Sequence, residues 1–285
     1  MEKAWLVVNA FLRSGSFLRM EKVLMDAAWD AGIEMAVKTN DSLMMDGSFF
    51  DAPRAALFFD KDLLLARRME MHGIRLYNSA DAIAVCDDKT LTTLALQAQG
   101  VAQPDTLLCP MTYPGIGFGD LAFLEPVADA LGFPMVVKEG KGSFGQQVYL
   151  AHDLAELKET VVRIGHSNLL FQRFIRESAG KDLRLYVVAG EVIAAIRREN
   201  LKGDFRANLE NGASATPYTP SAEETSLALA ACSACGTAFA GVDLLMGREG
   251  PLVCEVNSNA HFLGLMAATG VNPARQIVGL LKGCK

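Results

Sequence analysis

The sequence lacks an excess of basic residues, and it also lacks a long apolar run. Its 285 residues include 33 acidic and 27 basic side chains, which gives a formal net charge of −6. A protein that coats DNA or RNA needs a net basic surface, so this balance excludes that class of protein. The main uncharged stretch, residues 226–242, is rich in Ala and Gly, whereas a membrane span needs about 20 strongly apolar residues. We therefore expect neither nucleic-acid coating nor insertion into a membrane.

Signals for export and for metal binding by cysteine are scarce as well. The apolar run near the start, residues 4–8, is too short for the core of a signal peptide. Among the six cysteines, Cys232 and Cys235 form one C-x-x-C pattern with no second pair and no nearby His, which does not predict a zinc site. Such cysteines suit the core of a protein in a reducing compartment, so we expect a cytoplasmic location.

The composition that remains is typical of a folded protein, since 51% of the residues are hydrophobic and 21% are charged. Because domains run to about 100–200 residues, this length suits one large domain or a few small ones. In the first third, strand-like and helical patterns alternate: strands are expected at 5–9, 33–37, 55–59 and 74–77, and helices at 16–31 and 61–72. This alternation predicts parallel strands with crossover helices, a small Rossmann-like sheet. The turn at 9–16 lacks G-x-G-x-x-G, so NAD binding has no support.

The rest of the chain is expected to hold helices first and antiparallel strands later. Asp87 or Asp88 is the expected cap of a helix, and Ser221 with Glu224 forms a capping-box pattern. We expect helices at 79–85, 87–99, 121–131, 153–164 and 221–239, and from 272 onward; strands at 134–138, 146–150, 168–174, 242–246 and 252–256; a hairpin of 182–189 with 191–198; and loops at 111–120 and 199–220.

A glycine-rich turn follows a buried strand that ends near Lys138. Gly140, Gly142 and Gly145 allow backbone N–H groups to approach phosphate oxygens, and the lysine adds a point charge. The order of residues is not that of a Walker loop. Taken alone, the segment would be interpreted as an ordinary mobile β-turn.

Three oxygen-bearing side chains fall on the last strand pair. Asp243 and Glu255 can point to one face of neighbouring antiparallel strands, and Asn257 shares that face because it lies two residues after Glu255. Oxygen ligands of this kind suit Mg²⁺ or Mn²⁺. The alternative is a pair of strand ends whose acids face solvent.

Basic residues gather in the middle of the chain. Arg184 and Arg198 lie on the two arms of the expected hairpin, and Arg206 follows in the next loop. Arginine grips carboxylate or phosphate oxygens in a bidentate way, although a solvated charged face is the alternative. Residues 138–206 hold 12 basic and 9 acidic side chains, and the remaining residues hold 15 and 24, so an anion is expected to bind in this stretch.

Taken in order, these motifs resemble the ATP-grasp superfamily and, within it, the RimK-like branch. The resemblance rests on residues 136–145, 174–184, 192–198, 203–209, 240–245 and 250–257. It implies an α/β and α+β protein with the ATP-grasp fold. An N-terminal Rossmann-like domain would cover 1–84, and two α+β subdomains, 85–171 and 172–285, would enclose ATP.

The resemblance also implies roles for individual residues. ATP would be bound by Lys89, Lys138, Gly142, Ser143, Gln172, Arg173, Phe174, Ile175, Asp182 and Asn208. Mg²⁺ or Mn²⁺, as two ions, would be held by Asp243, Glu255 and Asn257. Arg184, Arg198 and Arg206 would act in catalysis at the phosphates and the reacting carboxylate.

Two departures from the family pattern stand out. Arg173 occupies a position where relatives commonly have Glu, so only its backbone is expected to contact adenine. The segment Ser258, Asn259, Ala260, His261 and Phe262 replaces a loop that usually reads Pro-Gly near the acceptor. We expect Ser258, Asn259 and His261 to contact substrate, with His261 either a base or a structural residue.

The implied reaction is ligation of a carboxylate to an amine through an acyl phosphate, with glutamate as the family-typical amino acid. The partners would be an amino acid and an unidentified acceptor, and a homo-oligomer is expected from the family. The turn at 11–17 is expected to form a wall of the acceptor site. Alternatives are a ligase for another amino acid or an amino-group carrier, a nucleotide-binding protein without turnover, and phosphoryl transfer without ligation.

Overall fold

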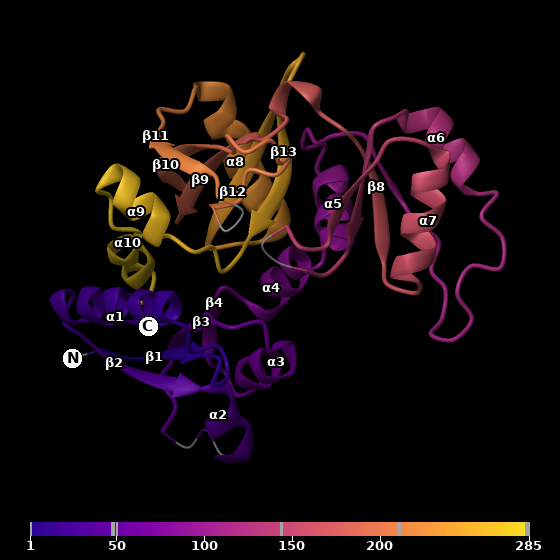
Figure 1. Ribbon diagram of the computed structural model, residues 1–285. Coiled ribbons are helices and arrows are strands. Elements are labelled where there is room, and N and C mark those ends of the chain that lie inside the picture. The colour runs from indigo at the N-terminus through magenta and orange to yellow at the C-terminus, as the bar shows by residue number, and fades with distance from the viewer. Residues whose placement is uncertain (1, 47–48, 50, 143–144, 210–211, 283–285) are drawn as a thin grey trace.

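Three β-sheets organise the described part of the chain, which in this computed structural model comprises residues 2–46, 49, 51–142, 145–209 and 212–282. The sheets follow one another along the sequence and occupy separate regions in space (Figure 1). The first sheet lies below the other two, which face each other across the central helices. The boundary expected at 84/85 lies within the helix Ala80–Asp87, and the one expected at 171/172 lies within the strand Leu169–Arg173 of the second sheet; this division into domains stays a prediction.

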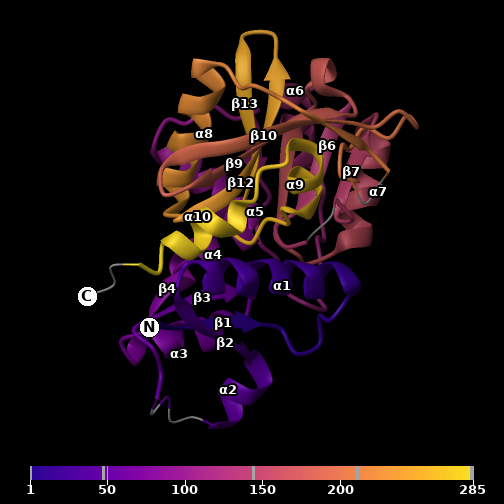
Figure 2. The ribbon, with the colours of Figure 1, turned by 90° about the vertical axis from the view of Figure 1, so that its left-hand side faces the viewer.

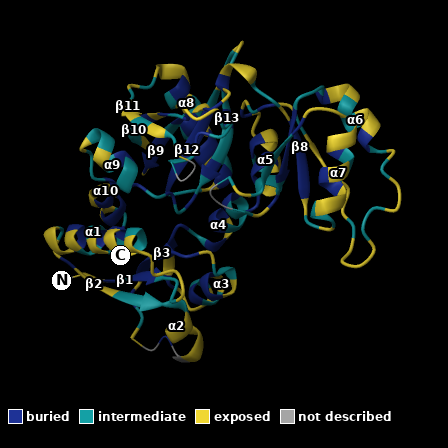
Figure 3. Cartoon of the chain, in the orientation of Figure 1, coloured by how far each residue is buried: buried dark blue, intermediate teal, exposed yellow. Residues whose placement is uncertain are grey.

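The first sheet is parallel, as expected, with the order β2-β1-β3-β4. Its elements are β1 (Glu2–Val8), α1 (Gly15–Asp30), β2 (Ile33–Thr39), α2 (Asn40–Asp46), β3 (Ala55–Phe59), α3 (Leu63–Met71) and β4 (Arg75–Tyr77). Every residue of β3 is buried, because apolar side chains cover both faces of this inner strand. The mostly exposed helix α2 was not predicted (Figure 3).

Two consecutive helices, α4 (Ala80–Asp87) and α5 (Lys89–Ala98), lead from the first sheet into the second. Asp88 is the cap of α5, since its carboxylate accepts a hydrogen bond from the Thr90 N–H at 2.9 Å. The cap therefore separates the two helices at one of the two residues expected from the sequence, Asp87 or Asp88.

The second sheet is antiparallel, with the order β5-β8-β6-β7. Its elements are β5 (Thr106–Leu108), α6 (Leu124–Leu131), β6 (Met135–Glu139), β7 (Val148–Ala151), α7 (Leu154–Ile164) and β8 (Leu169–Arg173). Helices α6 and α7 share an apolar core with one face of the sheet. The other face is left for the cavity described below.

The third sheet has the order β11-β10-β9-β12-β13. Its elements are η1 (Arg176–Ser178), β9 (Lys181–Val188), β10 (Glu191–Glu199), β11 (Ser214–Pro217), α8 (Ala222–Cys235), β12 (Phe239–Gly247), β13 (Gly250–Asn257), α9 (Leu263–Thr269) and α10 (Pro273–Gly279). The hairpin of β9 with β10 and the pair of β12 with β13 confirm the expected pairing.

Two expectations in this region were wrong. The helix expected at 221–239 ends at Cys235, because Gly236 takes a left-handed conformation, with φ 67°, and closes the helix. Residues 239–241 begin β12, where they pair with β9. The expected loop at 199–220 also contains β11, which pairs with β10.

The end of the chain returns to the first sheet. Helix α10 lies along α1 (Figure 2), and Ile277 and Val278 share one apolar core with Met20 and Leu24. This packing holds the third region against the first. None of the helices within the described ranges combines the length and the apolar character that crossing a membrane requires.

Candidate functional site

A cavity lies between the second and third sheets, and polar and charged side chains from both sheets line it. The residues that the motifs assigned to ATP meet here: Lys89, Lys138, Gly142, Gln172, Arg173, Phe174, Ile175, Asp182 and Asn208. Ser143 lies outside the described residues. Cys254, Ser178 and Lys181 also line the cavity, although none of them had been assigned a role in the site.

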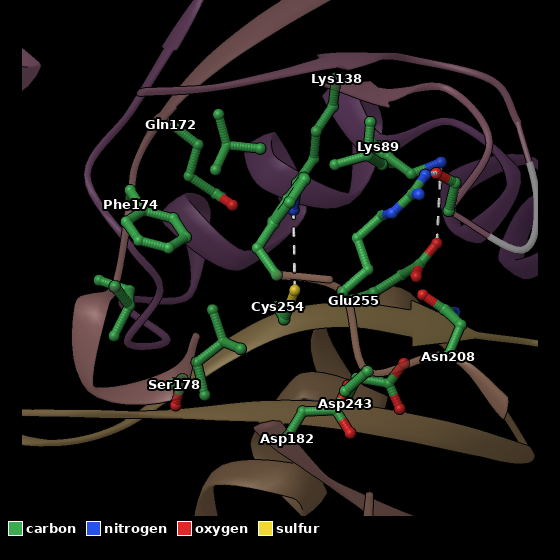
Figure 4. Close-up of a pocket in the computed structure, with 18 of the residues that line it drawn as sticks. Lys89, Lys138, Gln172, Phe174, Ser178, Asp182, Asn208, Asp243, Cys254 and Glu255 are labelled. Atoms are coloured by element: carbon green, nitrogen blue, oxygen red, sulfur yellow. Dashed lines mark hydrogen bonds and ion pairs between the residues drawn. The ribbon is translucent and has the colours of Figure 1, made fainter. Parts of the chain in front are cut away.

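Two lysines supply positive charge to this cavity (Figure 4). The Nζ of Lys138, on β6, lies 3.7 Å from the Cys254 Sγ, and Lys138 forms no ion pair with a carboxylate of the described residues. The Nζ of Lys89 donates to the Gly142 carbonyl at 2.9 Å and lies 3.7 Å from the Glu255 Oε1. A buried ammonium group without a carboxylate partner favours an anionic ligand.

The glycine-rich turn leaves no room for a side chain at Gly142. Gly142 has φ 144°, and a Cβ built there would collide with the side chain of Gln147. Glycine is therefore required at this point. The backbone is thereby kept within reach of Lys89 at the edge of the cavity.

Arg173 ends β8 at the segment expected to contact adenine, but its side chain is bound elsewhere. Its Nε donates to the Asp105 Oδ2 at 2.8 Å, and Nη1 and Nη2 donate to the carbonyls of Leu131 and Ala130 at 3.1 and 3.0 Å. These carbonyls end α6, where they lack partners inside the helix. None of the three residues that bind the guanidinium lines the nucleotide cavity.

Replacing Arg173 with Ala is therefore expected to change the half-saturating ATP concentration by less than about threefold, a free-energy change below the scale of one hydrogen bond. Fluorescence titration with an ATP analogue measures this concentration. Phe174→Ala, which removes a ring that lines the cavity, is the matched comparison and should weaken binding more. A tenfold loss in a folded Arg173→Ala variant would contradict the backbone-only role.

Four charged side chains form a continuous network on the cavity face of the third sheet. Arg198 donates from Nε and Nη2 to the two carboxylate oxygens of Asp182, both at 2.6 Å. Arg184 donates in the same bidentate way to Asp243, both at 2.7 Å, and Arg198 Nη2 also reaches the Asp243 Oδ2 at 2.9 Å. Asp182 and Arg184 lie two residues apart on β9, and Arg198 and Asp243 occupy the neighbouring positions on β10 and β12.

Burial and charge act on the two carboxylates of this network in different ways. Burial raises the pKa of the Asp182 carboxyl to about 6, although Arg198 favours the ionised form. Burial also opposes ionisation of Asp243, but Arg184 and Arg198 outweigh it and lower the pKa of that carboxyl. Asp243 is thus held as a carboxylate, the form that a divalent cation requires.

Of the three residues expected to hold metal, Asp243 and Glu255 line this cavity, and Asn257 lines the cavity that adjoins it. Asp243 and Glu255 are direct cross-strand partners on β12 and β13, and Asn257 follows two residues later. A carboxylate has about four lone-pair positions, so the three N–H groups that Asp243 accepts leave one position for a cation. The Nδ2 of Asn257 is buried without a partner, so this amide is not fixed by the protein.

This donor set fits Mg²⁺ or Mn²⁺ only with help from other oxygens. Within the described ranges, no three His, Cys, Asp or Glu side chains come together closely enough to hold a metal ion. Asp243, Glu255 and Asn257 supply three oxygen donors between them. Mg²⁺ keeps several waters and takes substrate phosphates as ligands, so an incomplete protein shell is normal for it.

Arg206 connects the two sides of the cavity. Its Nη1 donates to the Gly145 carbonyl at 2.6 Å, across from the third sheet to the glycine-rich turn. Its Nε and Nη2 bind the two oxygens of Asp204 at 3.0 and 2.8 Å. Hydrogen bonding to Arg206 lowers the pKa of the Asp204 carboxyl. Asn208, two residues on, lines both this cavity and the next.

A second cavity, of about 1250 Å³, adjoins the first and shares Gly142, Asn208 and Glu255 with it. Ser258, Asn259 and His261 line it. Leu12 and Phe17, from the turn expected to form a wall, line it too, as does Asn9. The His261 ring meets the edge of Phe17, with the ring centroids 4.3 Å apart. The segment that departs from the family pattern therefore faces the first sheet.

Asp60 also lines the second cavity, and it was not predicted from the sequence. A signal was available, because Asp60 directly follows β3 and Asn9 directly follows β1. Ligands of parallel sheets bind beyond the carboxyl ends of the strands.

Comparisons with known proteins bear on the family and on the fold. A family model described as "RimK-like ATP-grasp domain" matches residues 86–281. A Xylella fastidiosa protein named "Probable alpha-L-glutamate ligase" is 38% identical over 222 residues, 74% of this chain and 68% of that protein. A RimK domain ATP-grasp protein from Sphaerobacter thermophilus superposes with a TM-score of 0.73 at 21% identity, covering 99% of this chain and 100% of the other. The D-alanine–D-alanine ligase from Bacillus anthracis complexed with ATP superposes with a TM-score of 0.74 at 19% identity, covering 99% of this chain and 96% of the other. The two structures confirm the predicted fold.

Proposed function

The chain belongs to the RimK-like ATP-grasp family, and we propose that it is an ADP-forming ligase that joins a carboxylate to an amine. The observation that carries this proposal is the arrangement of Lys138 opposite the Asp243–Glu255 pair across one cavity. This arrangement places a positive charge that suits phosphates on one side of the cavity and oxygen donors that suit a divalent cation on the other side. ATP bound in the Bacillus anthracis ligase and the glutamate-ligase name of the Xylella relative support the same interpretation.

ATP would lie with its base at 172–175 and its phosphates toward the glycine-rich turn. Lys138 and Lys89 would contact the phosphates, and Arg206 would hold the turn over them through Gly145. Two anions must meet in this reaction, so fixed positive groups lower the barrier by balancing the charge that moves to the leaving oxygen.

Asp243, Glu255 and Asn257 would hold Mg²⁺ or Mn²⁺, two ions in the proposed complex. When bound, the metal supplies charge neutralisation at the transferred phosphoryl group. Arg184 and Arg198 keep Asp243 ionised and fix its carboxylate plane, which presents its free lone pair in one direction. These arginines thus act on the metal site by positioning Asp243.

The second cavity would receive the substrates that are joined, because it meets the nucleotide cavity at Glu255 and Asn208. A carboxylate there would be phosphorylated by ATP, and an amine would displace the phosphate from the acyl phosphate. Glutamate is the amino acid that the relatives' names suggest.

Measurement of ADP release across a panel of amino acids and amine acceptors tests the proposal, with mass spectrometry of the products. Release that depends on both a carboxylate and an amine, with a new amide product, is the expected result. ATP binding without turnover under every condition would instead indicate a nucleotide-binding protein. ADP release with phosphorylated product and no amide would indicate phosphoryl transfer alone.

Replacing Lys138 with Met is expected to weaken ATP binding by about 10- to 100-fold, the range for one charged hydrogen bond. Titration with a fluorescent ATP analogue measures the change. Lys181→Met is the matched control, because Lys181 lines the same cavity but is paired with Glu199 at 3.0 Å. Equal losses in the two variants would argue against a specific phosphate contact of Lys138.

A further inference from the structure

Among the described residues, one carboxylate of the second cavity has no cationic partner. Asp60 follows β3 and is only 8% exposed. Its Oδ1 accepts from the Lys61 backbone N–H at 2.7 Å and from the Asn9 Nδ2 at 3.1 Å, and its Oδ2 accepts only a longer bond, 3.2 Å, from the same Asn9 Nδ2. No Lys, Arg or His of the described ranges forms an ion pair with it. Burial raises the pKa of this carboxyl, and hydrogen bonds from the Asn9 side chain and from the backbone N–H groups of Lys61 and Asp62 oppose that effect only in part.

The other charged groups of this cavity have partners, which sets Asp60 apart. Asp87 pairs with Lys61 at 2.5 Å, Arg184 pairs with Asp243 at 2.7 Å, and Glu255 lies 3.7 Å from Lys89. A buried carboxylate that meets only neutral donors is costly unless a cation joins it.

A second unsatisfied acceptor lines the same cavity. The Nδ2 of Asn259 donates to the Asp60 backbone carbonyl at 2.9 Å, which fixes the orientation of the amide. Its Oδ1 is then buried and finds no hydrogen-bond partner in the part of the chain that the structure describes. The Asn9 amide is fixed too, since its Oδ1 accepts from the Phe11 N–H at 2.9 Å while its Nδ2 binds Asp60. The cavity thus offers two acceptors, one of them charged, and a complementary group must be a donor that carries positive charge.

We propose that Asp60 and Asn259 form a binding subsite for a primary ammonium group of the substrate. The inference rests on the proposed function, because it assumes that the second cavity receives the groups that are ligated. An –NH₃⁺ group offers three N–H donors and one charge, which satisfies the Oδ2 of Asp60 and the Oδ1 of Asn259 together. Leu12, Phe17 and Phe59 line the cavity as apolar surface for the rest of the substrate. The site therefore selects compounds with a free amino group over their N-acylated forms.

The experiment compares Asp60→Asn with the wild-type protein, using the standard amino acids and their N-acetyl derivatives at millimolar concentration as probes. ADP release gives the half-saturating concentration and the maximal rate, and thermal shift in the presence of an ATP analogue reports probe binding without turnover. We expect the wild-type protein to favour a free amino acid over its N-acetyl form. In Asp60→Asn the half-saturating concentration of that amino acid should rise about 10- to 100-fold with little change in maximal rate. Discrimination against the N-acetyl form should fall by a similar factor.

Asp87→Asn is the matched control, since it removes the same charge from the same cavity at a carboxylate that Lys61 already neutralises. It should leave the preference for free amines in place. Equal effects of the two substitutions, or unchanged discrimination in a folded Asp60→Asn, would overturn the subsite. The subsite would also be overturned if ATP binds normally but no free amino acid raises the thermal unfolding temperature of the wild-type protein. If the wild-type protein does not bind ATP at all, the proposed function itself is contradicted.

Discussion

Replacing Glu255 with Gln is expected to abolish ATP-dependent ligation while the fold stays intact. The substitution keeps the shape of the side chain and removes a charged oxygen donor opposite Asp243. Glu255 stands outside the arginine network, and its side chain is 27% exposed, so its charge contributes little to the stability of the core. Loss of one preorganised electrostatic group at a reacting centre costs about 100- to 1,000-fold in rate, and loss of a metal ligand should cost at least as much.

Initial rates of ADP formation, measured over a range of Mg²⁺ concentrations, test this expectation. Partial recovery at high Mg²⁺ would fit a weakened metal site. Glu249→Gln, in the exposed turn between β12 and β13, is the control with the same chemical change on the same hairpin and should behave as the wild type. Normal ADP formation by a folded Glu255→Gln variant would remove Glu255 from the metal site.

Replacing Arg198 with Met is expected to lower the free energy of unfolding by about 3–5 kcal/mol. Its side chain is 3% exposed and binds both Asp182 and Asp243. Without the guanidinium, Asp182 loses its bidentate partner and Asp243 keeps only Arg184. A buried carboxylate left without its cation carries the whole cost of removal from water.

Urea denaturation of the two proteins measures the change in free energy of unfolding. Arg197→Met is the matched control, because Arg197 is the preceding residue on β10, is 48% exposed, and lies 3.8 Å from Glu199; its loss should cost less than about 1 kcal/mol. Adding Asp182→Asn to Arg198→Met should restore part of the stability by removing one unpaired charge. Similar losses for Arg197→Met and Arg198→Met would show that the buried network is not the cause.

The local patterns were sufficient for elements with a continuous apolar run or a clear helical period and cap. The fully apolar strand at 55–59 and the helix at 153–164 were predicted nearly to the residue, since their period and caps lie within the segment itself. The short elements β5 and α9 escaped prediction. With three and seven residues, they are held by contacts with distant parts of the chain and not by their own propensity.

For the candidate site too, some features could be predicted from the sequence and others required the tertiary structure. Strand geometry with a period of two was enough to place Asp243 and Glu255 on one face. Lys138 was grouped with them through the resemblance to the ATP-grasp family. The sequence could not show that Arg184 and Arg198 bind Asp243. That contact requires β9 to lie between β10 and β12, two strands that are about forty residues apart in the chain.

Local pattern and ordered motifs were therefore enough for the family, the ATP-grasp fold and the faces on which the charged residues lie. Tertiary packing was needed to turn Arg173 to the end of α6, and to bring Asp60 into a cavity with Asn259, 199 residues away. The reason is physical: a buried charge takes its partner from whatever the packed sheets bring within reach, and sequence distance has no part in that choice.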